Sequence, residues 1–489
     1  MRSCRLGKEL TLPALAFILL TLLTGPAQAA PLTLPLSVST QSTLADQFGY
    51  APDYTRNVPA FDSVNRPFIR SRTASQHDTS FVDSLDSGVW VKSSLVSALV
   101  AAYPDFAGML GAGGYASDRI VFDAQDRAYT VLTVRLEEGE FRNVLLYSLD
   151  HGATWSVAEL PFGGEQPYYD NRDLGNVAME YFTGHNEISG PPFIAVWREI
   201  ADWPGNWASR NELWVVQPYF EGDRLVVPQP TLVTDRFLGM VQCSGGASFA
   251  ATLGGQTFFV WTQITSLPKR GTPTYVGVYD RATGTVTARR RLGYALPGND
   301  VHDTPGICAD SQGVLHVLSG AHGRPMLYQH SLAPRDIAAW SLPEPVLTSG
   351  YVWKGSDIDG EGRQTYLSLV CDANDTLHIV FRQTRRNVDE LYWGSKYYSL
   401  AHMSKPADGP WSPAQQLIVA ADGPGYVNYY QKLAVDRRGQ LYLSLNVFRR
   451  TDPVWMRPYR RFRQRMVLHS TDGLNWDFAT TETFQAGLL

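Results

Sequence analysis

Two histidines, a tyrosine and an arginine in the second half of the chain have types and spacing suited to proton transfer beside a bound anion. His302 and His322 are 20 residues apart, and Tyr366 and Arg382 are 16 residues apart. Imidazole exchanges protons near neutral pH, and aspartates beside it, as in Asn299-Asp300-Val301-His302-Asp303, can hold it in one tautomer. A guanidinium binds a carboxylate or a sulfate through two hydrogen bonds.

The elements that must position these residues are strands of an internal repeat. Asp310, Asp372 and Asp436 each follow an apolar run and open an Asp-x-x-Gly/Asp turn that leads into a second run. They are 62 and 64 residues apart, and Asp123 begins the same pattern three periods before Asp310. Hairpins repeated at this interval predict an all-β fold, arranged as a single β-propeller.

The length of the chain sets the number of blades. Dividing the roughly 460 residues after residue 29 by this period predicts seven blades, with six as the alternative. Six blades are expected near residues 115–170, 175–236, 240–297, 300–348, 362–418 and 425–480. The predicted domains are a signal peptide at 1–29, an N-terminal segment at 30–110 that forms a seventh blade or closes the ring, and a propeller at 111–489.

A second motif supports the propeller. Residues Ser148 to Trp155 fit the Asp-box hairpin Ser-x-Asp-x-Gly-x-Thr-Trp, and Ser470 to Trp476 form a shortened version. In this turn the aspartate caps backbone N–H groups and the tryptophan packs between blades. The motif indicates the fold but not the substrate, because it occurs in glycosidases, lyases and binding proteins.

The repeat predicts which residues share a rim. The first two strands of a blade are antiparallel, so the start of the first strand and the end of the second lie at the same side of the ring. Aligning the aspartates places the following residues there: His302, Tyr366 and Tyr430 (with its neighbour Tyr429) at strand starts, and His322 and Arg382 at strand ends. Structural interpretations stay open, since a single histidine is more often structural, Arg382 could pair with a carboxylate, and Tyr366 could be a packed aromatic.

Residues 1–29 have the features of a secretory signal peptide. Basic residues precede an apolar run from Leu10 to Leu23, and Ala27-Gln28-Ala29 forms a cleavage site, so cleavage is predicted after Ala29. The run is too short for a convincing membrane anchor. We therefore expect a secreted or periplasmic monomer without a membrane partner. The formal net charge of −5 argues against a nucleic-acid binder.

The remaining cysteines, Cys243, Cys308 and Cys371, are few and odd in number, so no disulfide framework is implied. Buried free thiols are favoured over a pair or a metal site, no spacing marks a metal site, and no cofactor is predicted. Arginines and aromatics alternate between Arg449 and Arg465, which suits an anionic polysaccharide or, equally, a solvated outer strand and loop.

The segment from Asp300 through His322 to Tyr328 resembles the BNR-4 repeat family, whose characterised members include propeller-type ulvan lyases. The resemblance is strongest from about residue 240 to 480, and those lyases carry two histidines, a tyrosine and an arginine at the same spacing. It implies a secreted lyase that cleaves a uronate-containing, ulvan-like polysaccharide by β-elimination.

The resemblance also implies roles. Arg382 would neutralise the uronate carboxylate, which acidifies the proton on C5, and His302 and Tyr366 would share the base and acid roles. His322 would orient the sugar, and Tyr430 or Tyr429 would line the subsite. Two alternatives remain. One is a sialidase-like glycoside hydrolase, although its arginine cluster and Tyr/Glu pair cannot be assembled here; the other is a non-catalytic glycan-binding propeller.

Overall fold

The computed structural model describes thirteen segments of the chain: residues 32–34, 59–72, 80–109, 119–137, 140–162, 176–202, 208–240, 247–295, 298–346, 363–386, 396–420, 426–449 and 463–489. Within them, the helices are α2 (Leu95–Ala102), α3 (Thr481–Gly487) and the 3-10 turns η1 (Pro268–Arg270) and η2 (Val301–Asp303). No helix in these segments has the length and apolar character needed to cross a bilayer.

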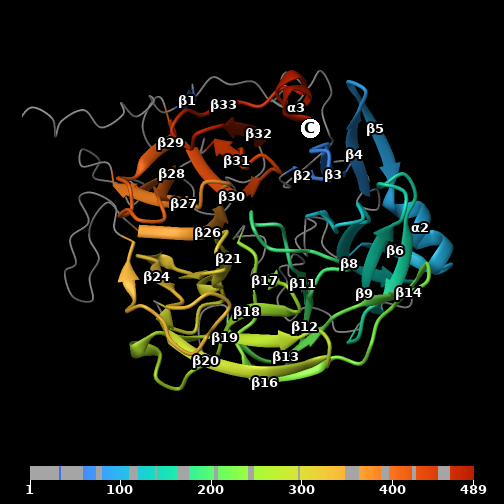
Figure 1. The fold of residues 1–489 in the computed structure, drawn as a ribbon, viewed down its shortest axis with the longest axis horizontal. Coiled ribbons are helices and arrows are strands. Elements are labelled where there is room, and N and C mark those ends of the chain that lie inside the picture. Colours follow the sequence, from blue (N-terminus) through green and yellow to red (C-terminus); the bar gives the residue numbers. More distant parts are fainter. Residues whose placement is uncertain are drawn as a thin grey trace, which may run out of the picture.

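In the described residues, strands make up seven blades, each built on four strands, that follow one another around a ring in chain order (Figure 1). Blade 1 contains β2 (Ala60–Phe61), β3 (Pro67–Arg72), β4 (Ser80–Asp86) and β5 (Val89–Ser94). Blade 2 contains β7 (Val121–Phe122), β8 (Ala128–Leu136), β9 (Phe141–Ser148) and β10 (Ser156–Glu159), with β6 (Phe106–Met109) also paired to β8. Blade 3 contains β11 (Val177–Met179), β12 (Ile194–Asp202), β13 (Ser209–Val216) and β16 (Thr231–Phe237), and carries the hairpin β14 (Tyr219–Glu221) and β15 (Arg224–Val226).

The second half of the ring continues this order. Blade 4 contains β17 (Ala250–Leu253), β18 (Gln256–Thr262), β19 (Thr272–Asp280) and β20 (Thr285–Ala295). Blade 5 contains β21 (Gly306–Ala309), β22 (Leu315–Ser319), β24 (Leu327–His330) and β25 (Glu344–Pro345). Blade 6 contains β26 (Arg363–Cys371), β27 (Leu377–Arg386), β28 (Lys396–Lys405) and β29 (Gln415–Ala420), extended by β1 (Leu32–Leu34) and β23 (His322–Arg324). Blade 7 contains β30 (Tyr426–Val435), β31 (Leu441–Arg449), β32 (Arg463–Ser470) and β33 (Asp477–Phe478).

The seven-bladed all-β prediction is thus confirmed, because the strands between Ala60 and Ser94 form a sheet of their own. Cys308 and Cys371 are both buried, and neither forms a disulfide. Several other predictions fall outside the described residues: the signal peptide at 1–29, Cys243, and the arginine-rich stretch from Arg450 to residue 462.

The repeated aspartates have the local role that their spacing predicts. Asp372 Oδ1 accepts hydrogen bonds from the backbone N–H groups of Asn374 and Thr376, both at 2.8 Å, and closes the turn between the first two strands of its blade. The fourth turn residue, Asp375, has φ of 59°, and Gly439 at the same place in blade 7 has φ of 82°. Glycine and aspartate recur here because this left-handed conformation is costly for most other residues.

In three of the four repeats, the turn aspartate is also bonded to the second strand. Asp123 Oδ2 accepts from the Tyr129 hydroxyl at 2.7 Å, and Asp372 Oδ2 lies 3.2 Å from His378 Nε2. His316 contacts Asp310 in the same way at 3.3 Å. His316 and His378 therefore take part in a hydrogen bond that lies within a blade and recurs from one blade to the next.

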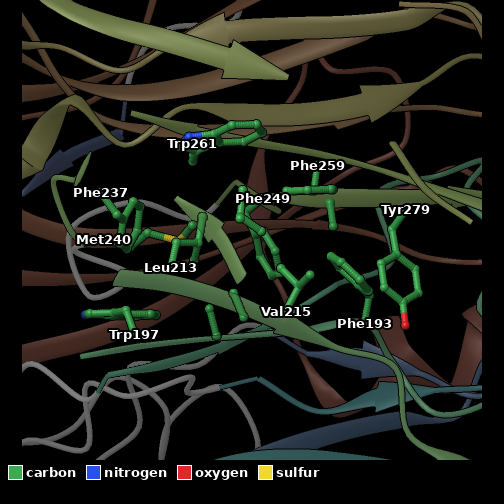
Figure 2. Packing of buried hydrophobic residues seen from close by; sticks show 14 residues of the cluster. Phe193, Trp197, Leu213, Val215, Phe237, Met240, Phe249, Phe259, Trp261 and Tyr279 are labelled. Atoms are coloured by element: carbon green, nitrogen blue, oxygen red, sulfur yellow. The ribbon is translucent and has the colours of Figure 1, made fainter. Parts of the chain in front are cut away.

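Packing between adjacent blades supplies the core. Figure 2 shows the cluster between blades 3 and 4, where aromatic rings from both sheets interleave. The rings of Phe259 and Trp261 stack with centroids 5.2 Å apart, and Phe193 lies 5.4 Å from Phe259. Gly277 is required beside them, because a Cβ atom there would lie 2.7 Å from the Phe259 ring.

The ring closes where blade 7 meets blade 1. Asn65 Nδ2 donates to Asp436 Oδ2 at 2.8 Å, and the Asn65 side-chain oxygen accepts from the Arg437 backbone N–H at 2.8 Å. Behind these bonds, Phe61, Tyr442 and Phe484 of α3 form an aromatic cluster, in which Tyr442 and Phe484 stack at 5.1 Å. Closure in the described residues thus rests on side-chain packing and polar bonds.

A segment between β11 and β12, residues 180–188, crosses the end of the ring where the aspartate turns lie. Its Ile188 carbonyl accepts from Ala124 of blade 2, and its Glu187 N–H donates to Thr252 of blade 4, at 2.9 and 2.7 Å. Its Thr183 carbonyl accepts from Cys371 of blade 6 at 2.8 Å. This crossing segment ties together blades that are not neighbours.

The buried histidine pair of blade 6 predicts a loss of stability in mild acid. His402 Nε2 lies 3.0 Å from His378 Nδ1, and burial, reinforced by the charge of His378, lowers the pKa of His402 well below its usual value. Unfolded His402 takes up a proton near pH 6.5, whereas the folded form resists it, so the free energy of unfolding falls as the pH drops below about 6.5.

Chemical denaturation between pH 7.5 and 5 measures this dependence. In His402→Gln, the slope of the free energy of unfolding against pH should be smaller by up to about 1.4 kcal/mol per pH unit, which is the contribution of one proton. An identical pH dependence in the parent chain and the variant would show that His402 does not carry the effect.

Candidate active site

The predicted rim residues converge at the junction of blades 5 and 6. His302 lies in η2, immediately before β21, and His322 begins β23. Tyr366 lies on β26, and Arg382 lies on β27, opposite Thr365. The ring centroid of His302 lies 4.3 Å from that of His322 and 5.8 Å from that of Tyr366. Arg382 contacts the Tyr366 ring, so the structure brings all four side chains together.

His322 reaches this site because β23 changes sheets. The chain leaves blade 5 at the end of β22 and pairs with β26 of blade 6, where His322 lies opposite Thr365. Gly320 permits the crossing, since a Cβ atom there would lie 2.3 Å from the Thr304 carbonyl oxygen. Because β23 pairs with the sheet of blade 6, the His322 imidazole, which comes from blade 5, lies two strands from Arg382.

One carboxylate orients both imidazoles. Asp300 Oδ1 lies 2.6 Å from His302 Nδ1, and Asp300 Oδ2 lies 2.8 Å from His322 Nδ1. Asp300 also accepts the backbone N–H of His302 at 2.9 Å and so caps η2. With Nδ1 engaged in each ring, proton exchange with a ligand falls to the Nε2 atoms.

The pKa values of the two buried acids beside the histidines are shifted in opposite directions. Burial opposes ionisation of Asp300, but hydrogen bonds from His302 and His322 outweigh it, so the pKa of Asp300 is lowered. Burial, together with the charge of Asp300, raises the pKa of Asp303 well above its usual value, although Thr272 donates to it at 2.8 Å. The ionised form is therefore favoured for Asp300, beside the imidazole pair, and the protonated form for Asp303.

Tyr366 and Arg382 form the floor of the site. The Arg382 guanidinium carbon lies 4.1 Å from the centre of the Tyr366 ring, and both residues are buried, at 5% and 7% exposure respectively. Tyr366 has φ of 66°, and the pairing of β26 with β27 shifts between Thr365 and Ser368. A left-handed tyrosine at a β-bulge costs about 1–3 kcal/mol, and such bulges re-aim side chains near functional sites.

Tyr429 and Tyr430 occupy the matching place in blade 7. Tyr429 lies opposite Asn446, and the pairing of β30 with β31 shifts between Tyr429 and Lys432, as it does around Tyr366. The alignment of Tyr430 with Tyr366 thus agrees with the backbone. Their side chains lie outside the described part of the structure, so their substrate contacts remain predictions.

Sequence reasoning missed the role of Asp300. The motif around His302 contains two aspartates, but only the fold shows that Asp300 bridges to His322, 22 residues away. His185 lies away from this rim, with its Nε2 atom 2.7 Å from the Asp372 carbonyl oxygen. Asp300, His302 and His322 also have ligand atoms within 4.8 Å of one another, a set that could hold a metal ion.

The fold and site define a seven-bladed β-propeller with an Asp, His, Tyr and Arg cluster on one rim. Residues 273–455 match a family model described as BNR repeat-containing family member. This range includes every residue of the cluster, and the match confirms the resemblance predicted from the sequence. A comparison with curated proteins found no match.

Solved structures that match this chain include a polysaccharide lyase, a sialidase and a lectin. The crystal structure of polysaccharide lyase Uly1 is 14% identical with a TM-score of 0.34, and the match covers 49% of this chain and 55% of that one. Trypanosoma rangeli sialidase in complex with the inhibitor DANA is 13% identical with a TM-score of 0.38, covering 72% and 54%. A mutant of Aleuria aurantia lectin is 11% identical with a TM-score of 0.34, covering 76% and 100%. At these values the similarities carry no argument about activity.

The charge difference between the two acids can be tested by amide substitution. Asp300→Asn removes the ionised acceptor of two imidazole N–H groups and should lower the free energy of unfolding at pH 7 by about 1–3 kcal/mol. Asp303→Asn replaces a neutral carboxyl group with a neutral amide and should cost less, although Asp303 is the more deeply buried of the two. Urea denaturation of both variants measures the difference. A larger loss for Asp303→Asn would contradict the assignment of charge.

Proposed function

We propose that this protein is a polysaccharide lyase that cleaves a uronate-containing glycan by β-elimination. The observation that carries the proposal is the meeting of Arg382, Tyr366 and the Asp300-bound histidine pair at one rim. An anion-binding group lies beside proton-transfer groups there, and β-elimination next to a carboxylate needs both. The match to the BNR repeat family over this region supports the proposal.

The proposed reaction removes one proton and returns one. The Arg382 guanidinium binds the uronate carboxylate and stabilises the charge that develops when the C5 proton is removed. The C5–H electron pair forms the C4–C5 double bond, the C4–O4 bond breaks, and O4 leaves with a proton. His302 and Tyr366 share the base and acid steps, which their ring separation of 5.8 Å permits around one sugar.

His322 has a different position from His302. Its side chain is 35% exposed, compared with 13% for His302, although both are held by Asp300. The more exposed imidazole is suited to contact a hydroxyl of the neighbouring sugar and so orient the chain. We further propose an exported enzyme acting on an anionic polysaccharide outside the cytoplasm, on the basis of the signal peptide predicted at 1–29.

The activity can be tested with the purified chain lacking residues 1–29. It is incubated with a panel of uronate polysaccharides, led by ulvan, and the ultraviolet absorbance of the unsaturated uronate is followed. His302→Ala and Tyr366→Phe should each lower kcat by about 10²–10⁴-fold, because each removes a proton-transfer group. His330→Gln, at a histidine on β24 away from the cluster, serves as the matched control and should retain activity.

Two results would contradict the proposal. New reducing ends without the unsaturated product would indicate a hydrolase. Retained binding of a polysaccharide, with no product of either kind and no effect of His302→Ala, would indicate a glycan-binding propeller.

The role of Arg382 gives a separate prediction. If its guanidinium pairs with the carboxylate, Arg382→Gln should lower kcat/KM by about 10²-fold or more, the amount expected from losing charge stabilisation in the transition state. The loss should be much smaller on a methyl-esterified substrate, whose carboxyl group carries no charge. Equal losses on the two substrates would show that Arg382 acts in some other way.

A further inference from the structure

A second cluster of chemically capable side chains lies at the other end of blade 6. A ring nitrogen of His185, the Cys371 thiol and a carboxylate oxygen of Asp375 all lie within 4.8 Å of one another. Cys371 ends β26, five residues beyond Tyr366, which places the cluster about 16 Å along the strand from the candidate active site. The proposed elimination uses none of these three residues.

The crossing segment holds His185 in place. The Cys371 N–H donates to the Thr183 carbonyl at 2.8 Å, and Asn186 Oδ1 accepts the Thr183 N–H at 2.7 Å. Gly184 has φ of 123°, and a Cβ atom there would lie 1.9 Å from the Cys371 carbonyl oxygen, so only glycine permits this approach. His185 Nε2 is then fixed 3.2 Å from Asp375 Oδ1.

An existing contact between blades explains part of the cluster. Asp375 accepts hydrogen bonds from the backbone N–H and hydroxyl of Ser311, at 2.7 and 2.6 Å, and thereby joins blade 5 to blade 6. Asp126 accepts the same two bonds from Ser63 at the junction of blades 1 and 2, at 2.7 and 2.5 Å. Among the described residues, no thiol and histidine join Asp126 in such a cluster, so the serine contact does not account for His185 and Cys371.

The ligand types favour a particular metal. A thiolate, an imidazole and a carboxylate together suit Zn²⁺, whereas Ca²⁺ and Mg²⁺ prefer oxygen ligands alone. Zinc–ligand bonds of about 2.0–2.3 Å place tetrahedral ligands about 3.5 Å apart, so a small contraction of the cluster would suffice. A water molecule would complete the coordination, and His185 Nε2 would exchange its hydrogen bond to the Asp372 carbonyl oxygen for the ion.

We propose that His185, Cys371 and Asp375 bind one Zn²⁺ ion, which fastens the crossing segment to blade 6. The ion would join segments 186 residues apart in the chain and hold the turn end of the ring closed. It is a structural site, separate from the candidate active site.

Spectroscopy with cobalt tests the site without reference to activity. The purified chain is treated with a chelator and then titrated with Co²⁺, whose thiolate complex absorbs in the near ultraviolet. One equivalent should give this band, Zn²⁺ should abolish it by displacement, and either metal should raise the melting temperature. Cys371→Ser should abolish the band, and His185→Ala should weaken Co²⁺ binding by at least about tenfold.

Matched variants separate this site from other thiols. Cys308 is also a buried free thiol of a neighbouring first strand but is not part of the cluster, so Cys308→Ser should retain the band. Asp375→Asn keeps an acceptor for Ser311 while removing the charge, so it tests the site even if Cys371→Ser fails to fold. A folded parent chain without the band or the metal-dependent melting shift would overturn the proposal, as would a band that survives Cys371→Ser.

Discussion

Each blade of this ring covers its apolar faces only against the blades on either side. The inner clusters therefore span neighbouring sheets, as Phe193 of blade 3 does with Phe259 of blade 4. The first and last blades meet the same requirement through Phe61, Tyr442 and Phe484. An open ring would expose these faces to water, so closure is the condition for burying the core and for fixing the relative positions of the strands.

Closure of the ring allows the site to contain a residue with a strained backbone. Tyr366 holds a left-handed backbone conformation at a β-bulge, and its carbonyl oxygen accepts a hydrogen bond from the Gln431 side chain of blade 7. The neighbouring blade thus helps to hold Tyr366 in a conformation that a free strand would avoid. The anchored tyrosine then lies over Arg382, and β23 brings His322 from blade 5 to complete the cluster.

The two ends of β26 have different chemistry. At one end, Asp300 supplies a buried negative charge that orients two imidazoles, beside a guanidinium and a phenol. At the other end, the crossing segment brings His185 onto Cys371 and Asp375 of blade 6. This separation lets substitutions at the turn end change stability without touching the groups that would contact a glycan.

The sequence by itself determined the all-β repeat, a ring of six or seven blades, and the rim on which His302, His322, Tyr366 and Arg382 meet. These follow from local patterns, because an aspartate turn between two apolar strands forms the same hairpin wherever it recurs. Only the tertiary structure decided that Asp300 bridges both histidines, that Tyr366 lies at a bulge, and that His185 meets Cys371 across the ring. Such contacts depend on how seven blades close around one axis, and no spacing within a single repeat records which distant segments that closure brings together.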